Sequence, residues 1–94
     1  METFLTDLDL LLTNRKEQKK SGSYTSSLFE AGTDRLLKKI GEEAGEVIIA
    51  AKNNDATELK NEAADLLFHL MIVLKDQNLS INDVIAVLKD RHNS

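Results

Sequence analysis

Two pairs of carboxylates have the spacing that lets helical side chains act together. Glu43 and Glu46 lie three residues apart, and so do Glu62 and Asp65. On a helix, residues three apart share a face, with Cβ atoms roughly 5–6 Å apart. Four converging carboxylates repel one another strongly, so such a site either takes up protons or binds cations. Hard oxygen ligands in this number favour Mg²⁺, with Mn²⁺ as the alternative.

Each pair lies beside an apolar stripe rather than opposite to it. Stepping 100° per residue places the carboxylates at the edge of the seam along which the two helices would pack. We therefore expect the pairs to face each other across an acidic helix pair. The alternative is that these acids are solvated helix faces, because 30% of the residues are charged and short acidic motifs are common in helical proteins.

Basic residues accompany the first acidic pair. Lys39 lies one turn before Glu43, and Lys52 comes late in the same segment. A lysine beside a metal-bound polyphosphate would contact outer oxygens that carboxylates cannot contact favourably. Arg35 and Lys38 are equally suited to surface ion pairs with nearby glutamates, which contribute only a few tenths of a kcal/mol each (about 0.2–0.5).

Two further features have a functional and a structural interpretation. His69 follows Asp65 by one turn, and a lone histidine near a core is more often a structural residue than a ligand for substrate. The stretch 21–27 is small, polar and glycine-containing, which is typical of a loop. Hydroxyls and N–H groups at 23–27 could hold a phosphate or a sugar, although a flexible linker is the alternative.

The elements that position these groups are predicted to be helices, because apolar residues recur with the 3.6-residue period and no stretch alternates with period two. The fold class is therefore all-α. We predict four helices per chain: one within 1–20, a second capped by Asp34 and stopped at Asn53, a third from near Asp55 to about Gln77, and a fourth capped by Ser80 and ended near His92.

The length of 94 residues suits one domain over 1–94, with an N-terminal helix (1–20), a substrate loop (21–33) and a helical core (34–94). The third helix has an apolar arc too wide for the second helix to cover. Because large exposed apolar patches are uncommon on monomers, we expect a homodimer whose interface includes Leu70 and Leu74. A monomeric helical hairpin with exposed leucines is the alternative.

Composition excludes several partners. The net charge of −4 and the pI of about 5.1 disfavour binding to nucleic acid. No apolar run approaches membrane-spanning length, and the first residues are acidic where a signal peptide is basic. There is no cysteine, so neither disulfides nor thiolate metal sites are available. The sequence predicts a cytoplasmic protein that does not bind membranes.

Several motifs, occurring together and in order, resemble one known family. They are Ser23-Tyr24-Thr25, the lysine pair and E-E-x-x-E of 37–47, Ala50-Ala51-Lys52, and the E-x-A-D-L with its following histidine in 62–70. This set looks like the phosphoribosyl-ATP pyrophosphatases. That family is similar to the wider all-α NTP pyrophosphohydrolases, the MazG-like group, which share only the acidic pairs. Thr33 and Phe68 depart from the family's commoner proline and tyrosine.

The resemblance implies an enzyme of histidine biosynthesis that hydrolyses phosphoribosyl-ATP to phosphoribosyl-AMP and pyrophosphate, as an intimate dimer built from four-helix bundles. It implies that Mg²⁺ is held by Glu43, Glu46, Glu62 and Asp65, and that Glu42 either completes the shell or orients the water. It places near substrate Ser23, Tyr24, Thr25, Lys38, Lys39 and Lys52, to which we add His69 as a candidate.

Hydrolysis of a triphosphate gathers charge on phosphate oxygens, so catalysis requires positive charge and a proton acceptor. We expect Glu42 or Glu46 to accept the proton from water, and Glu43 to act with them as a catalytic residue through the metal. Two rivals remain. One is a house-cleaning NTP pyrophosphohydrolase that shares the acidic pairs, and the other is a non-catalytic helical dimerisation module, which would not depend on divalent ions.

Overall fold

The computed structural model describes residues 2–18 and 22–93. Within these ranges the chain forms five helices and no strand: α1 (Glu2–Gln18), α2 (Tyr24–Ala31), α3 (Thr33–Lys52), α4 (Ala56–Asp76) and α5 (Ile81–His92). The predicted all-α fold is confirmed. Lys19, Lys20 and Ser21, which we assigned to the end of the first helix and the start of the loop, lie outside the described residues.

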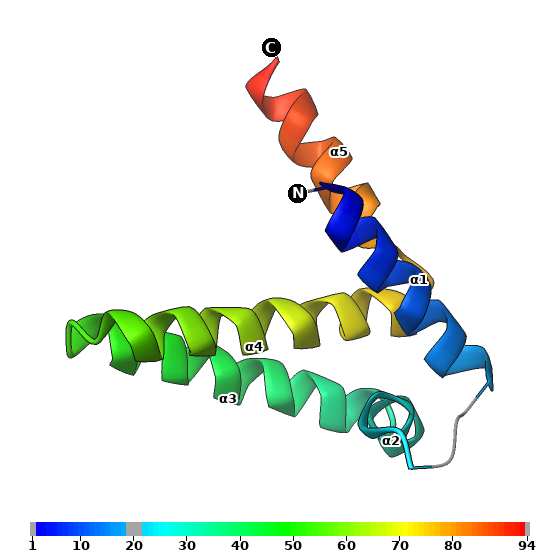
Figure 1. The fold of residues 1–94 in the computed structure, drawn as a ribbon, viewed down its shortest axis with the longest axis horizontal. Helices are drawn as coiled ribbons and strands as arrows, with labels where there is room; N and C mark the ends of the chain where they lie inside the picture. Colours follow the sequence, from blue (N-terminus) through cyan, green and yellow to red (C-terminus); the bar gives the residue numbers. More distant parts are fainter. Residues whose placement is uncertain (1, 19–21, 94) are drawn as a thin grey trace.

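Helices α3 and α4 form an antiparallel hairpin, and α1 and α5 lie side by side across one end of it (Figure 1). Asp55 caps α4, since its side chain accepts from the N–H of Glu58, and Ser80 begins α5 with a capping box completed by Asp83. The Ser80 cap was predicted, and the start of α4 was predicted to lie near Asp55. Each cap satisfies N–H groups that have no partner within the helix.

The predicted count of four helices is wrong, because α2 forms within the predicted loop 21–33. Ser23 caps this helix, its Oγ accepting from the N–H of Ser26 at 3.2 Å. Leu28 and Phe29 pack against the buried core. A local cap and an apolar pair thus override a composition that suggested a loop.

The prediction that Asp34 caps α3 is wrong. Gly32 separates α2 from α3 with φ +96°, a conformation that glycine adopts without steric cost. Asp34 lies instead in the first turn of α3, where a carboxylate interacts favourably with the helix dipole. Thr33 anchors this end to the last turn of α4, because its Oγ1 donates to Asp76 Oδ2 at 2.7 Å.

The apolar core lies where α1 and α5 meet the hairpin. Its buried members come from four helices: Leu12, Leu36, Met71, Ile72 and Ile81. Leu74 packs against this cluster from within the chain, whereas Leu70 stays 37% exposed. Part of the wide apolar arc of α4 is therefore covered by α1 and α5, which the sequence pattern did not predict. No helix in the described ranges is both long and apolar enough to cross a membrane.

Candidate active site

Three carboxylates converge across the α3–α4 seam. Glu43 on α3 and Glu62 and Asp65 on α4 each offer an oxygen, and these oxygens lie within 4.8 Å of one another. Glu43 is 7% exposed, Glu62 is half-buried and Asp65 is exposed. We call these three residues the acidic cluster. It contains three of the four metal ligands expected from the sequence.

The fourth expected ligand, Glu46, lies beside Glu62. Their side-chain hydrogen bond, then burial, and then contact with Glu58 raise the pKa of Glu62 to about 8. A carboxyl group crowded by two others retains its proton, because a second negative charge there is unfavourable. Without a cation, the folded chain therefore holds a proton on Glu62 at neutral pH.

Glu58 is the acid that sequence reasoning missed. It lies in the first turn of α4, where its N–H donates to the Asp55 cap, and it precedes Glu62 by four residues, so Glu58 and Glu62 share a helix face. The sequence shows this spacing within α4. It does not show that Glu46, on α3, approaches Glu62 as well.

The acidic cluster contains buried oxygens without a partner. Glu43 Oε2 and Glu62 Oε2 are inaccessible to solvent and accept no hydrogen bond from the described residues. Buried polar atoms are normally paired, so unpaired carboxylate oxygens invite a cation. The donors are all hard oxygens, the type that Mg²⁺ prefers. The residues present therefore fit a divalent cation.

A basic cavity of about 600 Å³ lies between α2 and α3. Its lining residues are Tyr24, Ser27, Leu28, Ala31, Arg35, Leu36, Lys38, Lys39 and Glu42. Four of these, Tyr24, Lys38, Lys39 and Glu42, were expected at the site, whereas Arg35 had been assigned equally to a surface ion pair. Three cationic side chains at one cavity can neutralise an anionic ligand such as a polyphosphate.

Lys39 links the basic cavity to the acidic cluster. It lines the cavity, and its Nζ lies 3.8 Å from Glu43 Oε1. The Lys39 side chain is 38% exposed and that of Glu43 is 9% exposed, so the lysine lies at the rim and the acid beneath it. Lys39 is therefore adjacent both to the basic cavity and to the acidic cluster.

Three expected substrate residues have other positions. The Ser23 hydroxyl accepts the capping hydrogen bond of α2. Thr25 is half-buried on α2, and Lys52 is exposed at the end of α3; neither lines the basic cavity. A second cavity, of about 270 Å³, lies towards the α3–α4 turn and is lined by Glu46, Ile49, Ala50, Asn53, Asp55, Glu58 and Glu62.

His69 is buried one turn beyond the acidic cluster. Its Nδ1 lies 2.7 Å from the backbone oxygen of Asp65, and its ring packs edge-on against Phe68. A carbonyl oxygen only accepts, so Nδ1 donates the hydrogen. Nε2 is buried and has no hydrogen-bond partner in the part of the chain that the structure describes.

The acidic cluster is suited to a divalent metal ion, and the basic side chains of the neighbouring cavity are suited to phosphates. Together they form a candidate site for a polyphosphate-bearing ligand. Residues 5–92 match the family described as phosphoribosyl-ATP pyrophosphohydrolase, and the chain belongs to that family. The family suggested by the sequence motifs is thereby confirmed.

Individual relatives support the same family membership. The chain is 52% identical to phosphoribosyl-ATP pyrophosphatase of Leptospira biflexa over 95% of its length and 97% of that protein. It is 54% identical to phosphoribosyl-ATP pyrophosphatase of Listeria welshimeri, over 93% of its length and 84% of that protein. It is also 52% identical to the histidine biosynthesis bifunctional protein HisIE of Bacillus subtilis, but spans only 42% of that longer protein.

Proposed function

We propose that this chain hydrolyses phosphoribosyl-ATP to phosphoribosyl-AMP and pyrophosphate, in histidine biosynthesis. The observation that carries the proposal is the direct link between the acidic cluster and the basic cavity through Lys39 and Glu43, 3.8 Å apart. Family membership supports the same reaction. A nucleoside triphosphate needs both halves of this site, because its chain of phosphates is large and highly charged.

The acidic cluster, with Glu46, would hold a Mg²⁺ or Mn²⁺ ion. When bound, that ion supplies the positive charge that hydrolysis of a phosphoric anhydride requires. Glu43 and Glu62 contribute the buried oxygens, which keep the ligand set in place. Asp65 is exposed and closes the cluster on its solvent side.

Side chains of the basic cavity bind and orient the substrate. Arg35, Lys38 and Lys39 would contact phosphate oxygens, with Lys39 nearest the acidic cluster and best placed to stabilise the departing pyrophosphate. Tyr24 is 59% exposed at the cavity and offers an aromatic face to the base or sugar. Ser23, Thr25, Lys52 and His69 stay candidates for substrate contacts.

A proton must leave the attacking water. Glu42 lines the cavity and is exposed, as is Glu46, so either carboxylate can accept it. Glu42 lies one turn from Glu46 on the same helix. We retain both as candidates for the general base.

A substrate panel tests the proposal. The full chain, with Mg²⁺ and with a chelator, is assayed for pyrophosphate release from phosphoribosyl-ATP and from ordinary nucleoside triphosphates. We expect Mg²⁺-dependent release with a strong preference for phosphoribosyl-ATP. Preference for ordinary or damaged nucleotides would favour a house-cleaning enzyme, and release from none of them would favour a helical dimerisation module.

We also propose that two copies of this chain associate in the cytoplasm. Large apolar side chains remain exposed on both hairpin helices, among them Ile48 (65%), Ile49 (61%) and Leu67 (40%). Burial of such surface is the usual driving force for association. Light scattering at micromolar concentration should give twice the chain mass, and a stable monomer would contradict the proposal.

A further inference from the structure

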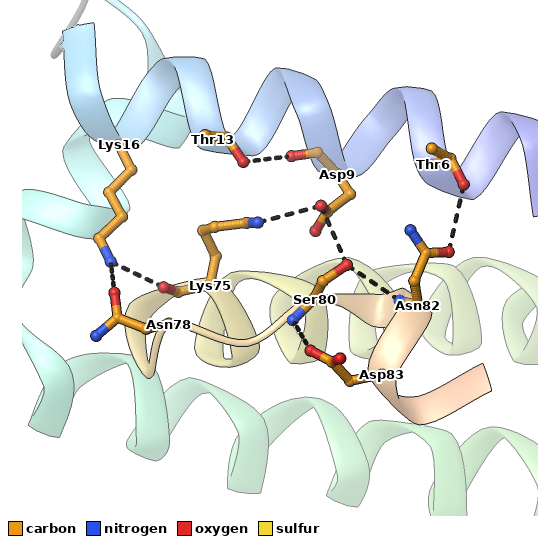
Figure 2. A network of polar contacts seen from close by, with 9 residues as sticks. All are labelled: Thr6, Asp9, Thr13, Lys16, Lys75, Asn78, Ser80, Asn82 and Asp83. Carbon is orange, nitrogen blue, oxygen red and sulfur yellow. Dashed lines mark hydrogen bonds and ion pairs between the residues drawn. The ribbon is translucent and has the colours of Figure 1, made fainter. Parts of the chain in front are cut away.

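One carboxylate oxygen joins three helices far from the acidic cluster. Asp9 lies on α1 and is 7% exposed. Lys75 Nζ, in the last turn of α4, donates to Asp9 Oδ2 at 3.1 Å, and Ser80 Oγ, at the start of α5, donates to the same oxygen at 3.2 Å (Figure 2). The position of α1 is therefore tied to both following elements.

A second contact ties α1 to the same place. Lys16 Nζ donates to the backbone oxygen of Lys75 at 2.8 Å and to Asn78 Oδ1 at 3.2 Å (Figure 2). Lys16 follows Asp9 by seven residues, which is two helical turns. Two directional contacts two turns apart set the register and direction of α1 on α4. The apolar packing of Leu12 lies between these two contacts and adds burial, which is itself non-directional.

Helix α1 in turn holds α2. Ser26 is 3% exposed, and its Oγ donates to the backbone oxygen of Arg15 at 3.1 Å. Arg15 immediately precedes Lys16. Helix α2 supplies Tyr24 and Ser27 to the wall of the basic cavity that faces the cationic side chains of α3. A series of hydrogen bonds thus runs from Lys75 through α1 to the part of the basic cavity that α2 forms.

We propose that Asp9 and Lys75 are positioning residues for the basic cavity. These two residues fix α1 on the end of α4. Through α1 they fix the distance between the α2 side of the basic cavity and the lysines of α3. The acidic cluster lies on the α3–α4 seam and does not depend on α1. The Asp9–Lys75 pair therefore governs substrate binding rather than cation binding, an inference that rests on the proposed function in taking the cavity as the nucleotide site.

The test uses Asp9→Asn in the full chain, which keeps the side-chain shape but removes the charge facing Lys75. We expect KM for phosphoribosyl-ATP to rise about tenfold, because small displacements of binding groups are costly. The value of kcat and the increase in melting midpoint caused by Mg²⁺ should stay unchanged. Tyr24 is the only tyrosine in a chain without tryptophan, so intrinsic fluorescence reports on α2 alone. In substrate-free Asp9→Asn, the fluorescence anisotropy of Tyr24 should be lower than in the wild type, because α2 is held less firmly.

The matched control is Thr6→Val on the same helix. It removes the exposed hydrogen bond from Thr6 Oγ1 to Asn82 Oδ1 (3.3 Å), which joins α1 to α5 and not to α4. We expect KM and the Tyr24 anisotropy of this control to match the wild type. Ser26→Ala removes the hydrogen bond from Ser26 Oγ to the backbone oxygen of Arg15, which joins α2 to α1, and leaves the Asp9–Lys75 pair intact. This variant should show a smaller rise in KM than Asp9→Asn and the same fall in Tyr24 anisotropy.

The inference is overturned if Asp9→Asn lowers the melting midpoint but leaves KM and Tyr24 anisotropy unchanged at a temperature where it is folded. Should Asp9→Asn not fold, Ser80→Ala removes one of the two hydrogen bonds on Asp9 Oδ2 and is judged by the same two readouts. Failure of the proposed function would be seen separately, as a wild type that releases no pyrophosphate, because anisotropy in the free protein needs no substrate.

Discussion

The two ends of the α3–α4 hairpin are buried by different kinds of side chain. Where α3 begins and α4 finishes, Leu36, Met71 and Ile72 pack against helices α1 and α5. Further along the seam, towards the turn, the buried residues of α3 are the acid Glu43 and the small Ala50. The first end is closed mainly by apolar packing, although the Asp9 carboxylate is buried there too, with Oδ2 on Lys75 and Oδ1 without a hydrogen-bond partner in the described residues. The second end contains two acids, Glu43 and Glu62, that each keep one buried oxygen without a partner.

This difference separates stability from function within one pair of helices. Apolar burial stabilises the fold whether or not a ligand is present. Crowded carboxylates oppose folding until a cation neutralises them, and strained functional sites of this kind persist only when the rest of the structure is stable enough. The apolar end should therefore control the free energy of unfolding, and the acidic end should control its response to Mg²⁺.

The largest effect on stability is expected at the apolar end. Ile72 is fully buried, and Ile72→Ala should lower the free energy of unfolding by about 2–5 kcal/mol through lost transfer energy and a cavity. Its Mg²⁺-induced increase in melting midpoint should match the wild type. Leu12→Ala, at the same end, should behave alike. Loss of the Mg²⁺ response together with stability would show that the two ends are not separable.

A smaller effect is expected from pH at the acidic end. The pKa of Glu62 is raised to about 8 from its ordinary value of 4.5. Its stabilising contribution is fully present below pH 4.5 and is lost as pH rises through 8, because unfolding then releases a proton that the folded chain retained. With a chelator, the melting midpoint of Glu62→Gln should rise relative to the wild type between pH 5 and pH 8.5.

The same titration predicts that Mg²⁺ displaces a proton. Calorimetric titration with Mg²⁺ at pH 7, in buffers of different ionisation enthalpy, should show proton release by the wild type and much less by Glu62→Gln. Equal heats in all buffers for the wild type would mean that Glu62 is already ionised and that the carboxylates are not crowded.

The smallest effect is expected at the rim between the basic cavity and the acidic cluster. Lys39→Ala should raise KM for phosphoribosyl-ATP by roughly three- to tenfold, because a partly exposed charged contact is weakened by solvent. Lys60→Ala, an exposed lysine of α4 that lines neither cavity, is the control. Equal kinetics for the two variants would return Lys39 to a solvated surface role.

Local signals in the sequence were enough for most of the fold. The Ser80 cap and the start of α4 near Asp55 were predicted correctly, because each lies directly before a periodic apolar segment. Helix α2 was missed because its local cap at Ser23 was not recognised within a loop-like composition, and because its apolar contacts are not local. Leu28 and Phe29 pack against a core whose members are as distant as Ile72 and Ile81, and the preceding serines and glycine suggested only a loop.

The site could be predicted in part for the same reason. Spacing along one helix predicted that Glu62 and Asp65 share a face, and the convergence of carboxylates predicted that the site takes up protons or binds a cation. Spacing places Glu58 on the same face as Glu62, but it could not show that Glu46 on α3 also crowds Glu62, since that depends on the register between two helices. The Asp9–Lys75 pair joins residues 66 apart in sequence, and no periodic pattern predicts it.

The central claim is tested most directly by melting wild type and Glu62→Gln with Mg²⁺ and with a chelator, alongside pyrophosphate release from phosphoribosyl-ATP. For the wild type, Mg²⁺ at about a hundred times its Kd should raise the midpoint by roughly 10–20 °C. Glu62→Gln should lose most of that increase and its activity, yet melt no lower than the wild type in chelator. Glu30→Gln, an exposed acid of α2, should resemble the wild type throughout. An active Glu62→Gln enzyme with an unaltered Mg²⁺ response would contradict the account.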